Sequence, residues 1–547
     1  MYSKETLSLI FKDKLHSPAE WENKYPPRPL ANTAKVTRFG PSPTGFLHIG
    51  GVYTAMISKS LALQSGGTYF VRTEDTDKKR EVEGVKEHFT EAFQYFDISP
   101  IENSSGLYGP YTQSSRLNIY LSYIKYLLEI GRAYPCFCGE ETLAENNQKQ
   151  KEEKVDLGYY GRWAHCRDLS NEEVERRIKQ GEDYVIRFRC NGNPESFEFE
   201  DLIRGKTKSK NNINDIVILK SSSNKLPLPT YHLAHAVDDH LMRVNLVVRG
   251  DEWLSSVSLH YQLFDALGFD QVSYAHIAPL MKLEGKSRRK LSKRKDPEAS
   301  VEYYMKEGFP AEAILSYLRG LVNSKLLDLP VQENLSTPLR LEECQTSGPL
   351  VDLVKLQDIS STAISSMSAI EIRENVYNWA CKYDEELALI MKNNWDQIPV
   401  YIDTDRFNNG RVRKDLAKWS EFSKLYDFYF DDIFNVVDGV DDQRLEDYSP
   451  DVVNRFLSEF QQRYSHKNEN ELWFNNIKEI AKSSGFALSN KEFKEAKENY
   501  LGTLKDATTI LRIVITGKKN SPSLYEVCQV LGQQEVLDRV GRVSSLS

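Results

Sequence analysis

The chain has 547 residues, of which 40% are hydrophobic and 27% are charged, and its formal net charge at pH 7 is −8. This length exceeds what one hydrophobic core can hold and predicts about three to five domains or subdomains. No uncharged run approaches the roughly 18 apolar residues of a transmembrane helix, so we expect no membrane span and no membrane partner. The acidic balance argues against nucleic-acid binding by overall charge. It does not exclude such binding, because a local basic face is enough to neutralise phosphates.

The first 34 residues form an N-terminal extension without an apolar stretch long enough for a signal peptide. Glu5, Asp13, Glu20 and Glu22 are interspersed with lysines there, which also argues against a mitochondrial presequence. We therefore expect a cytoplasmic protein. The seven cysteines are odd in number and scattered along the chain, so they predict no disulfide framework.

A strand, a loop and a helix follow the extension directly. Residues 36–39 are typical of a short strand, and residues 41–45 form a loop rich in proline and glycine. His48, Gly50 and Gly51 then open a segment with helical periodicity. Unpaired N–H groups and the helix dipole make such a helix N-terminus an anion site, and glycines let a nucleotide approach the backbone. Taken alone, the same pattern also describes a tight strand-to-helix turn.

A strongly basic segment occurs much later in the chain. Seven of the ten residues from 286 to 295 are lysine or arginine. By itself this run also fits a solvated basic loop, a nucleic-acid patch or a nuclear-import signal. Combined with the glycine-rich helix start, it favours a site that supplies cations and N–H groups to phosphates.

The two segments together resemble the HIGH and KMSKS motifs of class I aminoacyl-tRNA synthetases. Residues 38–51, followed by Arg-Thr-Glu-Asp-Thr-Asp at 72–77, resemble the bacterial-type glutamyl-tRNA synthetases more narrowly. The resemblance extends over nearly the whole chain from about Lys35. It implies ATP-dependent attachment of L-glutamate to the 3′ end of glutamate tRNA through a glutamyl-adenylate, with release of AMP and pyrophosphate. Such a reaction needs no protein nucleophile and depends on positioning and on stabilising charge at the phosphates.

The resemblance implies roles for residues of both motifs. Lys293 is the strongest single catalytic candidate. Position 291 is Leu where the general motif has Met, an apolar exchange of similar volume that should matter little. The implied catalytic residues are His48, Lys290, Ser292 and Lys293. The implied ATP-binding residues are Pro41, Thr44, His48, Gly50, Gly51, Lys290 and Lys293.

Glutamate has to be recognised by its charges. A side-chain carboxylate suits a bidentate arginine, and Arg38 and Arg249 are the candidates, whereas Glu74 suits the α-ammonium group. An isolated arginine at a strand end is more often part of a surface ion pair. His235 stands where many relatives have a small polar residue, so its role stays open. The implied glutamate-binding residues are Arg38, Ser42, Glu74, Tyr231, His235 and Arg249.

The expected fold is α/β followed by all-α. Alternating strand and helix patterns predict a Rossmann-like nucleotide-binding domain, and the resemblance implies an inserted α/β domain that holds the tRNA acceptor end. A stem-contact region and a C-terminal helical anticodon-binding domain are expected to follow. The expected boundaries are residues 1–34 for the extension, 35–113 and 231–300 for the two catalytic halves, 114–230 for the insertion, 301–380 for the stem contact and 381–547 for the anticodon domain.

Cys136, Cys138 and Cys166 resemble the zinc site that some members of this family carry. A closed tetrahedral site needs a fourth ligand, for which His165, Tyr160 and Asp168 are alternatives. The other interpretation is three reduced cysteines without metal. Mg²⁺ is expected with ATP, held mostly by phosphate oxygens.

Four competing functions remain at this stage. The nearest is glutaminyl-tRNA synthetase, against which stand Glu74 and the helical pattern of the C-terminal half. A shorter relative that glutamylates a modified tRNA base lacks the anticodon domain, and a small-molecule nucleotidyltransferase would not need the helical half. A catalytically silent tRNA-binding paralogue is disfavoured by His48, Lys290 and Lys293. The expected partners are L-glutamate and glutamate tRNA, with glutamine tRNA as an alternative acceptor, and the expected state is a monomer.

Overall fold

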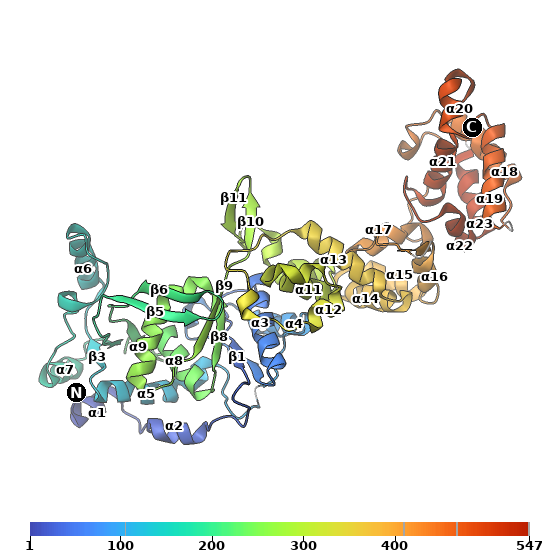
Figure 1. Ribbon diagram of the computed structural model, residues 1–547. Helices are drawn as coiled ribbons and strands as arrows, with labels where there is room; N and C mark the ends of the chain where they lie inside the picture. Colours follow the sequence, from blue (N-terminus) through green and yellow to red (C-terminus); the bar gives the residue numbers. More distant parts are fainter. Residues whose placement is uncertain (104, 409–410, 467–468, 545–547) are drawn as a thin grey trace. The chain divides into compact units, whose positions relative to one another are not determined.

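The computed structural model describes residues 1–103, 105–408, 411–466 and 469–544 (Figure 1). It divides into two compact units: unit 1 comprises residues 1–303 and 314–352, and unit 2 comprises residues 304–313 and 353–547. Unit 1 is a mixed α/β body and unit 2 is almost entirely helical, which confirms the predicted fold class. Within the described ranges, no helix is long and apolar enough to cross a membrane.

Parallel strands form the centre of unit 1. The first strand, β1, pairs in parallel with β2, and β8 pairs in parallel with β9, which continues through β5 to β6. The two ladders meet where the backbone N–H of Asn245 donates to the carbonyl oxygen of Val36 at 3.2 Å. The strands are β1 (Val36–Phe39), β2 (Thr68–Val71), β5 (Ser196–Asp201), β6 (Gly205–Lys210), β8 (Leu246–Gly250) and β9 (Ser273–Ile277).

Helices cover both faces of these strands. Neighbouring residues of a strand point to opposite faces, and β1 shows the result. The Thr37 hydroxyl donates to the carbonyl oxygen of Ser58 in α3 at 2.8 Å, whereas Val36 packs in the core formed by α5, α8 and α9. Burial on both faces fits the apolar run that opens β8, and in β1 it extends even to the polar residues Thr37 and Arg38. The helices are α3 (Ile49–Gln64), α4 (Val85–Tyr95), α5 (Leu117–Glu129), α8 (Tyr231–Leu241) and α9 (Val257–Leu267).

The stretch expected as an insertion forms two structures. One is an antiparallel sheet of three strands accompanied by two helices. The other is the β5–β6 hairpin, whose Asp201 pairs in parallel with Tyr274 and so extends the central sheet. The elements of the first are β3 (Ala133–Cys136), β4 (Val185–Phe188), β7 (Val217–Leu219), α6 (Glu140–Glu152) and α7 (Asn171–Lys179).

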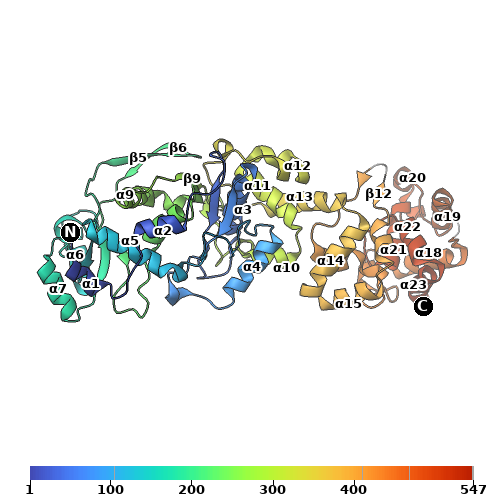
Figure 2. The ribbon, with the colours of Figure 1, turned by 90° about the horizontal axis from the view of Figure 1, so that it is seen from below.

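The N-terminal extension lies along unit 1 (Figure 2). Its first helix, α1 (Lys4–Ile10), packs on α7, and its second, α2 (Pro18–Lys24), begins with a capping box. Trp21 donates from its indole N–H to the Ser122 hydroxyl at 3.0 Å. The extension is thus tied to the insertion at one end and to the catalytic core at the other.

A basic hairpin and several short helices complete unit 1. The hairpin presents the predicted lysine loop and consists of β10 (Met281–Glu284) and β11 (Ser287–Lys290). The helices that follow it are α10 (Val301–Glu307) and α11 (Ala311–Val322), each of which has residues in both units, and α12 (Val331–Ser336), which lies in unit 1.

Unit 2 has one hydrophobic core that runs from Ile364 to Val543. The expected boundary at residue 380 falls within α14, because Ser368 caps this helix and no breaker interrupts it before Asp384. The C-terminal part of the chain was expected to be all-helical. Among its described residues there is one strand pair, a two-stranded ribbon of β12 (Phe407–Asn408) and β13 (Arg411–Val412). The helices are α13 (Leu353–Ser366), α14 (Ala369–Tyr383), α15 (Glu385–Asn393), α16 (Ile398–Asp403), α17 (Phe422–Tyr426), α18 (Pro450–Arg463), α19 (Asn470–Ser483), α20 (Asn490–Glu495), α21 (Leu504–Thr516), α22 (Leu524–Leu531) and α23 (Gln533–Ser544).

Candidate active site

A cavity of about 610 Å³ opens at the carboxyl ends of β1 and β8 in unit 1. Ligands of open parallel sheets bind at this edge. Most of the residues implied for the site line the cavity, although they come from both halves of the catalytic domain. Those that line it are Arg38, His48, Gly50, Gly51, Glu74, Tyr231, Arg249, Lys290, Ser292 and Lys293, and those that do not are Pro41, Ser42, Thr44 and His235.

The start of α3 forms one wall of the cavity. His48 is the N-cap residue, and its Nδ1 accepts a hydrogen bond from the Gly50 N–H at 2.9 Å. Burial lowers the pKa of His48 to about 4, with the charges of Lys293 and Lys290 acting in the same direction. A Cβ on Gly51 would lie 2.8 Å from the Leu47 side chain, so glycine is required there. The helix therefore presents a neutral imidazole, while the N–H groups of Gly50 and Gly51 are bonded to His48 itself.

The lysine loop closes the opposite wall. Lys293 reaches across to the carbonyl oxygen of Phe46, next to the histidine motif, and burial lowers the pKa of its amine. Leu291 is 3% exposed, which explains why this position needs an apolar side chain. The Lys290 amine lies 3.6 Å from the Glu252 carboxylate.

Asp296 anchors this loop, although no sequence pattern indicates it. Its carboxylate accepts the Ser292 N–H at 2.9 Å and two hydrogen bonds from Arg289 at 2.6 and 2.8 Å. The hydrogen bonds from Arg289 hold the pKa of Asp296 well below its usual range. The loop is thus fixed at its base, just beside the two lysines.

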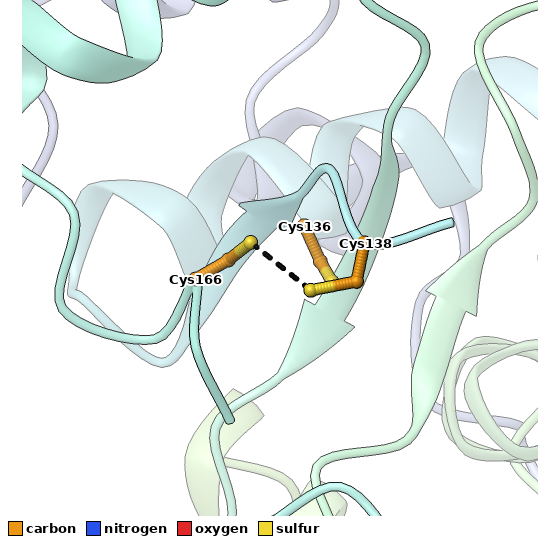
Figure 3. A group of neighbouring side chains, drawn as sticks. All are labelled: Cys136, Cys138 and Cys166. Carbon is orange, nitrogen blue, oxygen red and sulfur yellow. Dashed lines mark hydrogen bonds between the residues drawn. The ribbon is translucent and has the colours of Figure 1, made fainter. Parts of the chain in front are cut away.

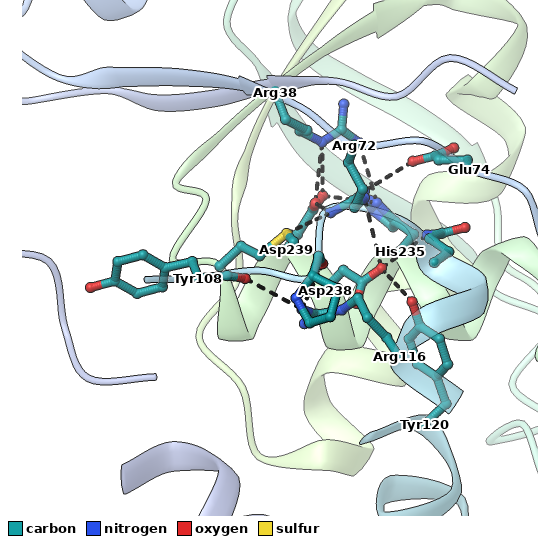
Figure 4. Close-up of polar contacts among 12 residues, drawn as sticks. Arg38, Arg72, Glu74, Tyr108, Arg116, Tyr120, His235, Asp238 and Asp239 are labelled. Atoms are coloured by element: carbon teal, nitrogen blue, oxygen red, sulfur yellow. Dashed lines mark hydrogen bonds and ion pairs between the residues drawn. The ribbon is translucent and has the colours of Figure 1, made fainter. Parts of the chain in front are cut away.

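Arg38 and Glu74 lie side by side at the end of β1 (Figure 4). Burial disfavours the charged form of Arg38, but the Asp239 carboxylate outweighs it and raises the pKa of Arg38. Burial raises the pKa of Glu74 although Arg72 pairs with it at 3.0 Å. A Cβ on Gly40 would overlap the Glu74 carboxylate, so this glycine keeps Glu74 at the cavity.

His235 lies behind Tyr231 rather than in the cavity. The two rings stack with centroids 5.7 Å apart, and His235 is fully buried. Its Nδ1 is 2.9 Å from Asp239 and its Nε2 is 3.2 Å from the Tyr274 hydroxyl. Burial lowers the pKa of His235 to about 4, so the ring is neutral. This arrangement gives His235 a supporting position.

Arg249 ends β8 and is 5% exposed. Its Nε donates to Nε2 of His276 at 3.0 Å, and its first terminal nitrogen is 3.3 Å from Nδ1 of His260. Its second terminal nitrogen is buried and has no hydrogen-bond partner within the described residues. A buried guanidinium nitrogen without a partner costs stability unless a ligand supplies the acceptor.

Three thiols converge in the insertion (Figure 3), with their sulfur atoms within 4.8 Å of one another. The Tyr159 hydroxyl lies 3.2 Å from the sulfurs of both Cys136 and Cys138, and it accepts the Cys166 N–H at 3.1 Å. Three sulfurs and one phenol oxygen make a four-donor set that fits a tetrahedral zinc ion.

The three alternatives considered for the fourth ligand are bonded elsewhere. His165 contacts Asn146 at 2.9 Å, and Asp168 pairs with Arg189 at 2.9 Å. Tyr160 donates to the carbonyl oxygen of Asp156 at 2.5 Å. Of the tyrosine pair at 159 and 160, the one that faces the sulfurs is therefore Tyr159.

Comparisons with known proteins agree on one family. Residues 35–358 match the description "tRNA synthetases class I (E and Q), catalytic domain", and residues 411–543 match "Anticodon binding domain". A glutamate–tRNA ligase of Acetivibrio thermocellus is 40% identical over 551 residues, covering 99% of both chains. One from Clostridium perfringens (strain 13 / Type A) is 38% identical, covering 97% of this chain and 99% of its own.

Solved structures give the same result. The crystal structure of a glutamate tRNA ligase from Elizabethkingia meningosepticum, in complex with its amino acid, superposes with a TM-score of 0.74 at 25% identity. The match covers 94% of this chain and 100% of that one. The chain therefore belongs to the glutamate–tRNA ligase family of class I tRNA synthetases.

Proposed function

We propose that the cavity of unit 1 binds ATP and L-glutamate together and joins them to glutamyl-adenylate, from which glutamate passes to tRNA. The full-length relatives and the matched catalytic domain support glutamate as the amino acid. The observation that carries the assignment is the buried guanidinium nitrogen of Arg249, which lacks a partner and belongs to a residue lining the cavity. A substrate carboxylate is the acceptor that it needs.

The first step transfers an adenylyl group. A carboxylate oxygen of glutamate attacks the α-phosphorus of ATP, a P–O bond forms, and pyrophosphate leaves. A ribose hydroxyl at the tRNA 3′ end then attacks the carbonyl carbon of the adenylate, and AMP leaves as the hydroxyl loses its proton. Both steps build charge on phosphate oxygens, so stabilisation of that charge is what the protein must supply.

The ATP end of the cavity carries the groups for this stabilisation. The neutral His48 donates to phosphate oxygens at the positive end of the α3 dipole, and Pro41, Thr44, Gly50 and Gly51 shape the loop around them. Lys290 and Lys293 neutralise the departing pyrophosphate from the opposite wall. Mg²⁺ accompanies ATP and is held mainly by its phosphates.

At the glutamate end of the cavity, charged side chains recognise the charged groups of the substrate. Arg249 binds the side-chain carboxylate with Arg38 beside it, Glu74 accepts from the α-ammonium group, and Tyr231 and Ser42 add hydroxyl contacts. Glutamine carries a neutral amide in place of the carboxylate, so it would leave the Arg249 charge uncompensated. This difference favours glutamate over glutamine.

The remaining parts of the chain contact tRNA in this proposal. The insertion at 114–230 holds the acceptor end, residues 301–380 touch the stem, and the helical part from 381 reads the anticodon. Glutamine tRNA is a second acceptor to be tested alongside glutamate tRNA. We propose that the protein acts as a monomer.

Zinc binds the thiol cluster in this proposal. Cys136, Cys138, Cys166 and Tyr159 would hold it, and its contribution is structural, because four protein ligands close the coordination sphere and leave no position for substrate. The metal therefore stabilises the insertion and takes no part in adenylate formation.

ATP–pyrophosphate exchange tests the proposal. The full-length protein is assayed with glutamate, glutamine or aspartate, each with and without total tRNA. Exchange with glutamate alone among the three supports it, and exchange with glutamine would favour a glutaminyl-tRNA synthetase instead. Absence of exchange under every condition would point to a silent tRNA-binding paralogue. The Arg249→Ala variant should raise the KM for glutamate at least tenfold while the KM for ATP changes by less than about twofold.

A further inference from the structure

Two adjacent aspartates on α8 are fully buried and face different arginines (Figure 4). Asp238 accepts from Arg116 at 2.6 Å, from the Tyr120 hydroxyl at 2.7 Å and from Gln113 at 2.9 Å. Consecutive helix residues point about 100° apart, so Asp239 projects elsewhere, towards the glutamate end of the cavity. The two carboxylates thus have equal burial and equal charge but different hydrogen-bond partners, although Arg72 also lies 3.7 Å from Asp238.

Behind the cavity wall, Asp239 is bound to two arginines in addition to His235. Arg38 Nε lies 3.2 Å from both carboxylate oxygens of Asp239, and Arg72 donates to one of them at 2.6 Å. The opposing charges of Arg38 and Arg72 hold the pKa of Asp239 well below its usual range, although burial alone would raise it. The carboxylate therefore stays ionised and directs both guanidinium groups.

Arg72 connects Asp239 to Glu74 and so fixes the position of Glu74 as well. One terminal nitrogen of Arg72 contacts Asp239, and the other donates to the Glu74 carboxylate at 3.0 Å. Arg72 is fully buried, so its planar fork has one orientation, which sets the position of Glu74 relative to Arg38. Arg38 and Glu74 are the groups proposed for opposite charges of the substrate.

The charges at this end also match the substrate. Arg38, Arg72 and Arg249 carry three positive charges, and Asp239 and Glu74 carry two negative ones, which leaves one net positive charge. Free glutamate has one net negative charge. Without the Asp239 carboxylate, Arg38 and Arg72 would repel each other, and Arg38 would lose the partner of its Nε.

We propose that Asp239 is a positioning residue that fixes Arg38 directly and Glu74 through Arg72, so that one carboxylate sets the distance between two groups that recognise opposite charges of glutamate. The inference rests on the proposed function, since it assigns these groups to glutamate. Asp239 itself touches no substrate. Asp239 affects the affinity for glutamate and leaves the affinity for ATP unchanged. Among the hydrogen bonds and ion pairs described, no residue at the ATP end of the cavity contacts it.

The test compares Asp239→Asn with Asp238→Asn in the full-length protein. Both substitutions remove one buried charge from the same helix and should lower the thermal midpoint similarly. ATP–pyrophosphate exchange is then measured with tRNA, varying glutamate and ATP in turn. We expect Asp239→Asn to raise the KM for glutamate roughly tenfold or more while the KM for ATP changes by less than about twofold. Asp238 lies 3.7 Å from Arg72 at its nearest. Asp238→Asn should therefore change the KM for glutamate by less than about threefold.

A second pair keeps the inference testable if the aspartate variants do not fold. Arg72→Lys retains the charge, but a single ammonium group cannot bridge Asp239 and Glu74, so the KM for glutamate should rise at least about fivefold. Arg116→Lys makes the same exchange beside Asp238 and should leave that KM within about twofold.

Three results would overturn the inference: a normal glutamate KM in Asp239→Asn or Arg72→Lys, an equal rise in the matched control, or an equal rise in the KM for ATP. A wild-type protein that fails to exchange with glutamate would instead overturn the proposed function. The two failures are therefore distinguishable.

Discussion

The Nε atom of Arg249 donates a hydrogen bond to Nε2 of His276 at 3.0 Å, and the other ring nitrogen of His276 lies 2.6 Å from Asp201. His276 can accept from Arg249 only if its proton is on Nδ1, where Asp201 accepts it. Burial lowers the pKa of His276 against the opposing effect of Asp201, so the ring is neutral. Asp201, on β5, thereby fixes the orientation of the arginine proposed to bind the glutamate side chain.

His276→Phe should raise the KM for glutamate about tenfold, because the ring volume stays but Arg249 Nε loses its acceptor. His276→Gln offers an amide oxygen in its place and should recover part of the loss. Exchange kinetics at varied glutamate measure both. Equal KM values for the Phe variant and the wild type would mean that Arg249 is held by its other contacts.

The stability of unit 1 should fall as the pH falls from 7.5 to 5. Burial lowers the pKa of His232 and of His235 to about 4, whereas an unfolded histidine titrates near 6.5. Between these values the unfolded chain binds more protons than the folded one, so each histidine costs about 2 kcal/mol of stability at pH 5. Urea unfolding across this range measures the loss.

His235→Asn supplies the control for this pH dependence. Asparagine does not titrate, so the variant should lose a smaller amount of stability on going to pH 5 than the wild type does. A wild-type midpoint that is constant between pH 7.5 and 5 would contradict the neutral, buried state of these rings.

Lys293→Ala should reduce adenylate formation by about two to three orders of magnitude, because a charge that stabilises the departing pyrophosphate is lost from the cavity. tRNA affinity should change little. Single-turnover formation of adenylate and filter binding of tRNA measure the two quantities. Lys295→Ala is the matched control: that lysine is exposed and its ion pair with Glu284 spans 3.9 Å, so near wild-type rates are expected. Similar rates for Lys293→Ala and the wild type would exclude the proposed role.

The purified protein should contain about one zinc ion per chain, as the donor set formed by three cysteines and Tyr159 requires. Tyr159→Phe removes the oxygen donor and should weaken zinc binding about tenfold or more, measured by competition with a chromogenic chelator. Cys136→Ser should lower zinc content further, whereas Cys381→Ser, in unit 2, should not. A wild-type protein free of zinc after growth in zinc-supplemented medium would disprove the site.

Local patterns made much of the fold predictable. The strand–loop–helix around His48 is encoded by neighbouring residues: a short apolar strand, glycines where a Cβ would collide and a periodic helix. The helical nature of unit 2 was likewise visible in its periodicity. The β5–β6 hairpin was not assigned to the central sheet, because its parallel pairing with β9 depends on residues more than 70 positions away.

Sequence motifs predict the residues of the candidate site that are proposed to contact substrate, but not the residues that hold them in place. Arg38, Glu74 and Arg249 follow from motifs, but Asp239 and His276 do not, since nothing near them in sequence shows which arginine they contact. Arg38 and Asp239 are 201 residues apart and meet only after folding. The same reason explains the thiol cluster, where Tyr159 and Tyr160 are chemically identical and only the backbone geometry decides which one faces the sulfurs.

The N-terminal extension contacts the C-terminal end of α8 and supports this helix. Glu22 contacts His240 at 2.6 Å and Arg243 at 2.7 Å, directly after the two aspartates of that helix, and Arg28 pairs with Glu102 on the loop before α5. The match to the catalytic-domain description begins at residue 35. A shortened protein that starts there would keep every motif residue. It would, however, lose these contacts to α8, the helix whose Asp239 organises the glutamate end of the cavity.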